Sequence, residues 1–148
     1  MFLTFISHTN FIFLIFTLSS RAMNTILVVD DNADIRLLVS LTLENEHVRI
    51  VEASTAADAI ARCAELKPDL IIMDVNMPGG MNGIEAARVI TSNPLTANCP
   101  IIMLSGVSNP SIQSKALEAG ASTFLKKPFS PLELIETVED TIAGSVCI

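Results

Sequence analysis

Residues 26–32 read ILVVDDN, an apolar run that ends in two adjacent carboxylates. The run shows no alternation of apolar and polar side chains, which is typical of a strand covered on both faces in a parallel sheet. Two neighbouring carboxylates repel each other, and burying either without a partner is unfavourable. We therefore expect a buried strand that ends where Asp30 and Asp31 meet a positive charge.

Further apolar runs alternate with helical patterns along the chain. Strands are expected over Ile26–Val29, Val48–Val51, Leu70–Met73, Ile101–Leu104 and Ser122–Leu125. Helices are expected after an Asn32 cap, after a Ser54 cap, over Ile84–Thr91, from Asn109–Pro110 to Gly120, and after a capping box at Ser130. Five strand–helix units with right-handed crossovers predict an α/β fold, a doubly wound five-stranded parallel sheet with five helices on its two faces.

The charge argues against one class of binding partner, and the cysteines indicate the cellular compartment. The formal net charge is −7 and no basic cluster is visible, which argues against a nucleic-acid surface. The three cysteines, Cys63, Cys99 and Cys147, are far apart and outside any metal-ligand spacing. We interpret them as small hydrophobic residues in a reducing compartment, and we expect a cytoplasmic protein.

Residues 1–22 differ from the rest of the chain. Five of the seven Phe lie within residues 1–16, yet the segment has neither a positive n-region nor an Ala-x-Ala cleavage site. Residues 7–10 interrupt it, and it is short for a membrane span. Two interpretations stay open, a mis-assigned start upstream of Met23 or a membrane anchor. The folded domain is expected over residues 23–148, with membrane association only if residues 1–22 are an anchor.

Polar side chains follow the strands at what should be one edge of the sheet. Asp30 and Asp31 follow the first strand, Asp74 the third, Ser105 the fourth and Lys127 the fifth. Ligands of open parallel sheets bind at the carboxyl ends of the strands. Three carboxylates suit a hard cation such as Mg²⁺, and carboxylate, Mg²⁺, lysine and hydroxyl together suit phosphoryl transfer to an Asp oxygen.

Four blocks in the same order as in a known family support this chemistry. They are VVDDN (residues 28–32), IIMDVNMP (71–78), IMLSG (102–106) and FLKKPF (124–129). The chain from Asn24 to about Ala143 resembles a response-regulator receiver domain of the stand-alone, chemotaxis-regulator type. The resemblance implies a flavodoxin-like sheet with strand order 2-1-3-4-5.

The resemblance also implies an acceptor and a metal site. Asp74 occupies the position of the phosphoryl acceptor. Asp30 and Asp31 occupy the acidic pair, in which the second residue usually binds Mg²⁺ directly and the first acts through water. Asn76 would offer its backbone carbonyl to the metal, and Asp74 its carboxylate.

The remaining implied roles concern catalysis and switching. Lys127 is the lysine of the family motif, and Pro128 follows it where the family usually has a cis peptide. Ser105 would turn its hydroxyl toward the phosphoryl group, and Phe124 is the aromatic switch residue that moves with it. One departure is the loop MPGGMNG after Asp74, which is about one residue longer than usual.

The function implied by the resemblance is that of a single-domain response regulator. Mg²⁺-dependent phosphoryl transfer to Asp74 from a histidine kinase or histidine phosphotransfer protein would switch a face that binds an unidentified downstream protein. The chain would be a monomer or weak homodimer and would catalyse only its own phosphorylation and dephosphorylation.

Two other functions stay open. A phosphorylation-independent binding module would have the same fold, but such variants generally lose the acceptor, an acidic residue or the lysine. A small phosphatase of the haloacid-dehalogenase type would use an aspartyl phosphate, but it usually carries Asp where this chain has Asn76.

Overall fold

The computed structural model describes residues 24–107 and 109–145, which contain one five-stranded sheet. The strands are β1 (Asn24–Val29), β2 (Val48–Ala53), β3 (Leu70–Asp74), β4 (Ile101–Ser105) and β5 (Thr123–Lys126). All neighbouring strands pair in parallel, in the order β2-β1-β3-β4-β5. The predicted strand order is therefore confirmed.

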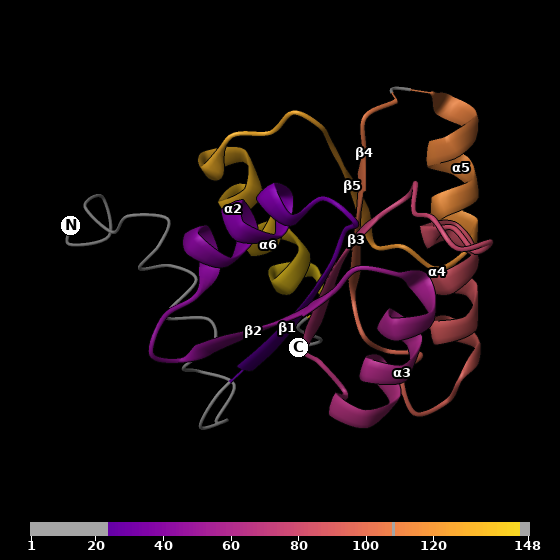
Figure 1. Ribbon diagram of the computed structural model, residues 1–148, viewed down its shortest axis with the longest axis horizontal. Coiled ribbons are helices and arrows are strands. Elements are labelled where there is room, and N and C mark those ends of the chain that lie inside the picture. The colour runs from indigo at the N-terminus through magenta and orange to yellow at the C-terminus, as the bar shows by residue number, and fades with distance from the viewer. Residues whose placement is uncertain (1–23, 108, 146–148) are drawn as a thin grey trace.

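Five helices cover the two faces of the sheet. They are α2 (Ala33–Leu43), α3 (Ala56–Leu66), α4 (Gly83–Ser92), α5 (Pro110–Glu118) and α6 (Pro131–Ser145). Figure 1 shows α2 and α6 on one face and α3, α4 and α5 on the other. The predicted doubly wound α/β architecture is confirmed.

The central strands are apolar on both faces because each face has its own core. Leu27 and Val29 of β1 pack on the side of α3, α4 and α5, whereas Ile26 and Val28 pack on the side of α2 and α6. All four side chains are fully buried. This two-sided burial explains why the sequence of β1 shows no period-two alternation.

Short polar caps start the helices at the carboxyl edge of the sheet. The Asn32 side chain accepts a hydrogen bond from the Asp34 N–H at the start of α2, as predicted. The Ser54 cap is wrong. Thr55 occupies that position, because α3 begins at Ala56 and the Thr55 hydroxyl accepts from the Asp58 N–H at 3.1 Å.

Cys63 is buried in the core and Cys99 is half-buried, and both are free thiols. Burial raises the pKa of Cys63 and raises that of Cys99 to about 12, so both stay neutral. This agrees with their interpretation as small hydrophobic residues.

The expectations for residues 1–22 and for Cys147 lie outside the described residues. Across residues 24–107 and 109–145, no helix has both the length and the apolar character that crossing a bilayer requires.

Candidate functional site

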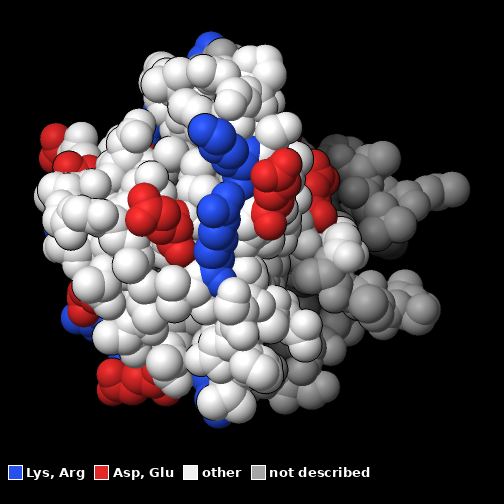
Figure 2. Space-filling view, turned by 90° about the vertical axis from the view of Figure 1, so that its right-hand side faces the viewer, with Lys and Arg blue, Asp and Glu red and all other residues white. Residues whose placement is uncertain are grey.

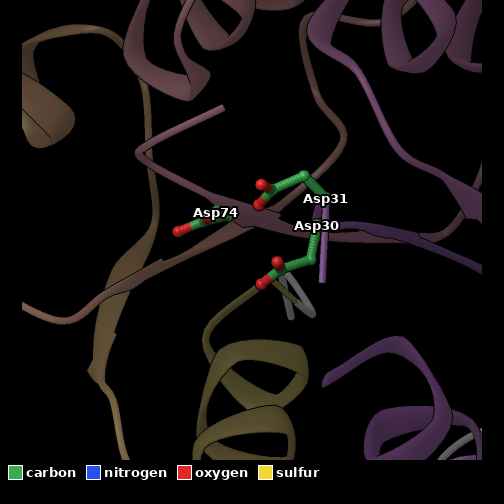
Figure 3. Close-up of side chains that lie close together, drawn as sticks. All are labelled: Asp30, Asp31 and Asp74. Carbon is green, nitrogen blue, oxygen red and sulfur yellow. The ribbon is translucent and has the colours of Figure 1, made fainter. Parts of the chain in front are cut away.

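Three carboxylates meet at the carboxyl edge of the sheet. Asp30 and Asp31 follow β1, and Asp74 is the last residue of β3. Because β1 and β3 are parallel neighbours, both strands end at the same place. One carboxylate oxygen from each residue lies within 4.8 Å of the others. Figure 3 shows the three side chains extending to the same side of the strand ends.

Asp30 is the buried centre of this cluster, with a side chain that is 0% exposed. Its Oδ2 accepts a hydrogen bond from Lys127 Nζ at 2.7 Å, and its Oδ1 accepts from the Asn32 N–H at 2.9 Å. Its own N–H donates to the Ala53 carbonyl of β2. Every polar group of this carboxylate has a partner, which is what burial of a charge requires.

Lys127 supplies the positive charge predicted beside the acidic pair. Its Nζ lies 2.7 Å from Asp30 Oδ2 and 3.2 Å from Asp74 Oδ1, so one ammonium bridges the two buried carboxylates. Burial acts to lower the pKa of Lys127, but the hydrogen bonds and charges of Asp30 and Asp74 outweigh it and raise that pKa. Lys127 therefore remains charged throughout the neutral range.

Asp74 is only 4% exposed. Its pKa is raised, first by burial and then by the negative charge of Asp30. The Lys127 ammonium and a backbone hydrogen bond from Asn76 act in the opposite direction without cancelling the rise. Burial and the charge of Asp30 together thus outweigh the effect of the lysine on the pKa of Asp74.

Asp31 differs from its two neighbours because its side chain is exposed. Within the described part of the chain, no residue forms a hydrogen bond or an ion pair with its carboxylate. Its oxygens are therefore accessible to a ligand that arrives from solvent.

The other predicted residues lie around this cluster. Ser105 is fully buried at the end of β4, and its Oγ accepts from the Val107 N–H at 3.1 Å. The Lys127 N–H donates to the Ser105 carbonyl at 2.7 Å, which joins the ends of β4 and β5. Phe124 is half-buried on β5 and packs against the core beneath α3, α4 and α5. The Lys127–Pro128 peptide is cis, as the resemblance implied.

The donor set and the charge of this cluster fit a hard divalent cation. Carboxylate oxygens are ligands that Mg²⁺ prefers, and Mg²⁺ in proteins commonly takes one or two of them together with water. The pKa of Asp74 is raised first by burial and then by the negative charge of Asp30, and a cation bound at this carboxylate would favour its charged form. The exposed Asp31 carboxylate has no partner among the described residues, whereas both Asp30 oxygens have partners and Asp74 Oδ1 lies 3.2 Å from Lys127 Nζ.

Two residues at the site escaped the sequence predictions because they act on backbone atoms. Arg36 Nη1 donates to the Asp30 carbonyl oxygen at 2.8 Å. Gly83 begins α4 directly against the Asp74 carbonyl oxygen, which a Cβ at this position would overlap. The sequence signal for Arg36 was an isolated arginine early in the helix that follows the acidic pair. For Gly83 it was the unusual MPGGMNG loop.

Comparison with known proteins agrees with this geometry. Residues 26–139 match the response regulator receiver domain family. The chain is 41% identical over 111 residues to the phosphate regulon transcriptional regulatory protein PhoB of Pseudomonas aeruginosa, covering 75% of this chain and 48% of that protein. It is 42% identical over 114 residues to the transcriptional regulatory protein ResD of Bacillus subtilis, covering 77% and 46%. The chain thus spans about half the length of these curated relatives.

Solved structures give the same result. The chemotaxis protein CheY4 of Vibrio cholerae superposes with a TM-score of 0.76 at 33% identity, over 81% of this chain and 99% of that one. The family match covers most of the described fold and includes all the residues of the acidic cluster and Lys127. The chain belongs to the response regulator receiver domain family.

Proposed function

We propose that this chain is a phosphorylation-dependent switch of a two-component or phosphorelay system, with Asp74 as the acceptor. The observation that carries the proposal is the Lys127 ammonium, which bridges Asp30 and Asp74 beside the exposed Asp31 carboxylate. The phosphoryl donor would be a phosphohistidine on a histidine kinase or a histidine phosphotransfer protein.

In the proposed step, a carboxylate oxygen of Asp74 attacks phosphorus in line with the departing imidazole. A phosphorus–oxygen bond forms, the phosphorus–nitrogen bond breaks, and the imidazole leaves with the electron pair and takes up a proton. Lys127 Nζ, 3.2 Å from Asp74 Oδ1, is placed to neutralise charge on the transferred oxygens. Asp31, Asp74 and the backbone carbonyl of Asn76 would hold Mg²⁺. When bound, the ion would supply further charge neutralisation for the phosphoryl oxygens.

Switching would begin at Ser105. Its hydroxyl now pairs with the backbone of Val107, its own loop. A phosphoryl group on Asp74 adds strong acceptor oxygens, and a hydrogen bond from Ser105 to them would exist only in that state. This difference in contact free energy is what shifts a population between two conformations.

The proposed readout is a protein-binding face that includes β5 and α6. Phe124 of β5 and Thr137 of α6 line a cavity of about 420 Å³ between these elements, so a shift of the Phe124 ring would reshape it.

On the face formed by α3, α4 and α5, Figure 2 shows Lys and Arg side chains interspersed with Asp and Glu rather than gathered in a broad basic patch. Together with the net charge of −7, this favours a protein as the downstream partner.

The proposal is tested by incubating the chain and its Asp74→Asn variant with Mg²⁺ and acetyl phosphate and recording intact masses. We expect one phosphoryl adduct on the wild type, none on the variant, and removal of the adduct by hydroxylamine. If acetyl phosphate gives no adduct and beryllofluoride leaves the NMR spectrum of the wild type unchanged, the chain is a phosphorylation-independent binding module. Sustained turnover of p-nitrophenyl phosphate would instead favour a phosphatase.

A further inference from the structure

Arg36 contacts the acidic cluster through the backbone rather than through a carboxylate. It extends from α2, and its Nη1 donates to the Asp30 carbonyl oxygen at 2.8 Å. Its Nε donates to Glu52 Oε1 on β2, also at 2.8 Å. The Arg36 side chain is 20% exposed, so most of it is enclosed between these elements. One planar guanidinium therefore ties the end of β1 to β2 and α2.

The carbonyl that Arg36 holds belongs to the peptide group linking Asp30 to Asp31. A peptide group is planar, so the direction of the Asp30 carbonyl also fixes the Asp31 N–H and the Asp31 Cα. On the other side of Asp30, its N–H donates to the Ala53 carbonyl at 3.2 Å. The backbone that leads into Asp31 is thus anchored from both sides.

This anchoring matters for Asp31 because its carboxylate has no hydrogen-bonding partner of its own among the described residues. Asp30 is positioned by side-chain bonds to Lys127 and Asn32, whereas Asp31 depends on its backbone for its position. The closeness of Asp31 to Asp74 in the cluster therefore rests on how the peptide before it is oriented.

We infer that Arg36 is a positioning residue for a divalent cation, because it orients the Asp30–Asp31 peptide and so directs the Asp31 carboxylate toward Asp74. The inference rests on the function proposed above, and it adds a residue that contacts neither the phosphoryl group nor the ion. Residues that hydrogen-bond to metal ligands and orient them commonly change the affinity for the metal, even though they do not contact it.

Charge alone predicts the opposite effect of removing Arg36. A guanidinium beside the cluster repels a divalent cation, so loss of its charge would strengthen binding if charge were its only contribution. Loss of positioning would weaken binding. The sign of the change therefore distinguishes the two roles.

Arg62 offers a control matched in charge and chemistry. It lies on α3, lines the same surface pocket as Arg36, and pairs through its Nε with Asp58 Oδ2 at 3.0 Å. No described contact joins it to Asp30, Asp31 or Asp74. Arg62→Met thus removes the same charge and the same kind of ion pair without touching the Asp30 carbonyl.

The experiment titrates the full chain with Mn²⁺ and follows free Mn²⁺ by electron paramagnetic resonance. Wild type, Arg36→Met, Arg36→Lys and Arg62→Met are compared, with thermal unfolding of each recorded in the absence of metal. Arg36→Lys keeps the charge, but one ammonium cannot reproduce the fork that spans Asp30 and Glu52. It also provides a second variant in case Arg36→Met does not fold.

We expect the dissociation constant for Mn²⁺ to rise roughly 10-fold or more in Arg36→Met and to rise, by a smaller factor, in Arg36→Lys. Arg62→Met should bind as the wild type does or slightly more tightly. Equal or tighter binding by the folded Arg36 variants would overturn the positioning role and leave the proposed function intact. A wild-type chain that binds no Mn²⁺ would overturn both.

Discussion

Lys127 and Asp30 form the ion pair on which the charge balance of the site depends. The Asp30 carboxylate is 0% exposed, and the Lys127 ammonium is the only cationic side chain that the described residues place in contact with it. A buried ion pair adds little net stability compared with an apolar pair of similar shape, but removal of one partner leaves a buried charge uncompensated. The stability of this edge of the sheet should therefore respond strongly to the loss of either charge alone.

We expect Lys127→Met to lower the free energy of unfolding by about 3 kcal/mol, because Asp30 then keeps a buried charge without its cation. Urea denaturation measures the loss. The double variant Lys127→Met/Asp30→Asn should recover most of it, since the uncompensated charge is gone. A double variant no more stable than Lys127→Met would show that Asp30 is not the source of the loss.

Asp74 gives a prediction with a defined pH dependence. Its pKa in the folded chain is raised above the unfolded value by burial and by Asp30. The stability that it contributes is therefore present below the unfolded pKa and is lost as the pH rises through the folded pKa. Without divalent cations, Asp74→Asn should raise the Tm at pH 7 by roughly 2–4 °C.

The gain from Asp74→Asn should shrink as the pH falls through the raised pKa of the folded chain, because the wild-type carboxyl then becomes protonated. Thermal unfolding in EDTA at a series of pH values measures it. An equal gain at all pH values would mean that ionisation of Asp74 is not its cause.

At this scale the sequence predicted which ionisable residues lie together, because Asp30, Asp31, Asp74 and Lys127 each stand at or just after the end of a strand. It did not predict which carboxylates Lys127 contacts, since that depends on the depth of each side chain at the sheet edge. The isolated Arg36 did not by itself indicate what it contacts, because a hydrogen bond to a backbone carbonyl requires no particular residue type as the partner.

Among the elements, α4 is positioned most closely against the site. Gly83, its first residue, donates its N–H to the Val75 carbonyl at 2.8 Å, and the Asp74 carbonyl oxygen occupies the space of a side chain. Asn82 caps the helix by accepting from the Glu85 N–H. The absence of a Cβ at Gly83 thus allows α4 to begin directly beside the end of β3.

We expect Gly83→Ala to reduce the free energy of unfolding by about 1–3 kcal/mol, because the added methyl displaces either α4 or the end of β3. Gly144→Ala is the matched control, since Gly144 is also helical, in α6, and a Cβ there meets open space. It should be neutral or stabilising by up to about 1 kcal/mol. Chemical denaturation compares the two, and equal effects would contradict the close approach at Gly83.

The elements themselves were largely predictable, and their ends were less so. The helix expected over Ile84–Thr91 spans Gly83–Ser92, a difference of one residue at each end. The error at Ser54 arose because Ser54 and Thr55 are equally good caps by chemistry, and only the tertiary position of α3 selects Thr55. The weakly patterned β2 and β5 lie at the two edges of the sheet. Some of their side chains are exposed, so these strands need fewer apolar residues than the central ones.

For the molecule as a whole, cation binding and folding should be linked. Under the proposed function, Mg²⁺ would bind the assembled cluster and not the separated carboxylates of an unfolded chain, so it should stabilise the fold by about 1.4 kcal/mol at ten times its dissociation constant. We expect the Tm of the wild type to rise with Mg²⁺ concentration and that of Asp31→Asn to rise much less. Differential scanning calorimetry measures both, and Ca²⁺-free, Mg²⁺-free buffer provides the baseline. An equal response in the two proteins would place the ion elsewhere.

The domain boundary gives a second prediction at this scale. Every described strand and helix lies within residues 24–145, and the family match covers residues 26–139. We propose that residues 23–148 are sufficient for the fold, so a chain that begins at Met23 should keep the Tm of the full chain and its Mg²⁺ response. A lower Tm for the shorter chain would show that residues 1–22 contribute to the folded structure.

The contact between Lys127 and Asp30 joins residues 97 positions apart in the chain. No local segment can therefore assemble the site, and during synthesis Asp74 emerges from the ribosome long before its ammonium partner. A nascent chain, or one whose last strand has detached or been cut away, would present the acceptor without the charge that the proposed transfer needs. Under the proposed function, only a chain that is synthesised at least as far as Lys127 and folded would receive a phosphoryl group, so shorter or unfolded chains would not signal.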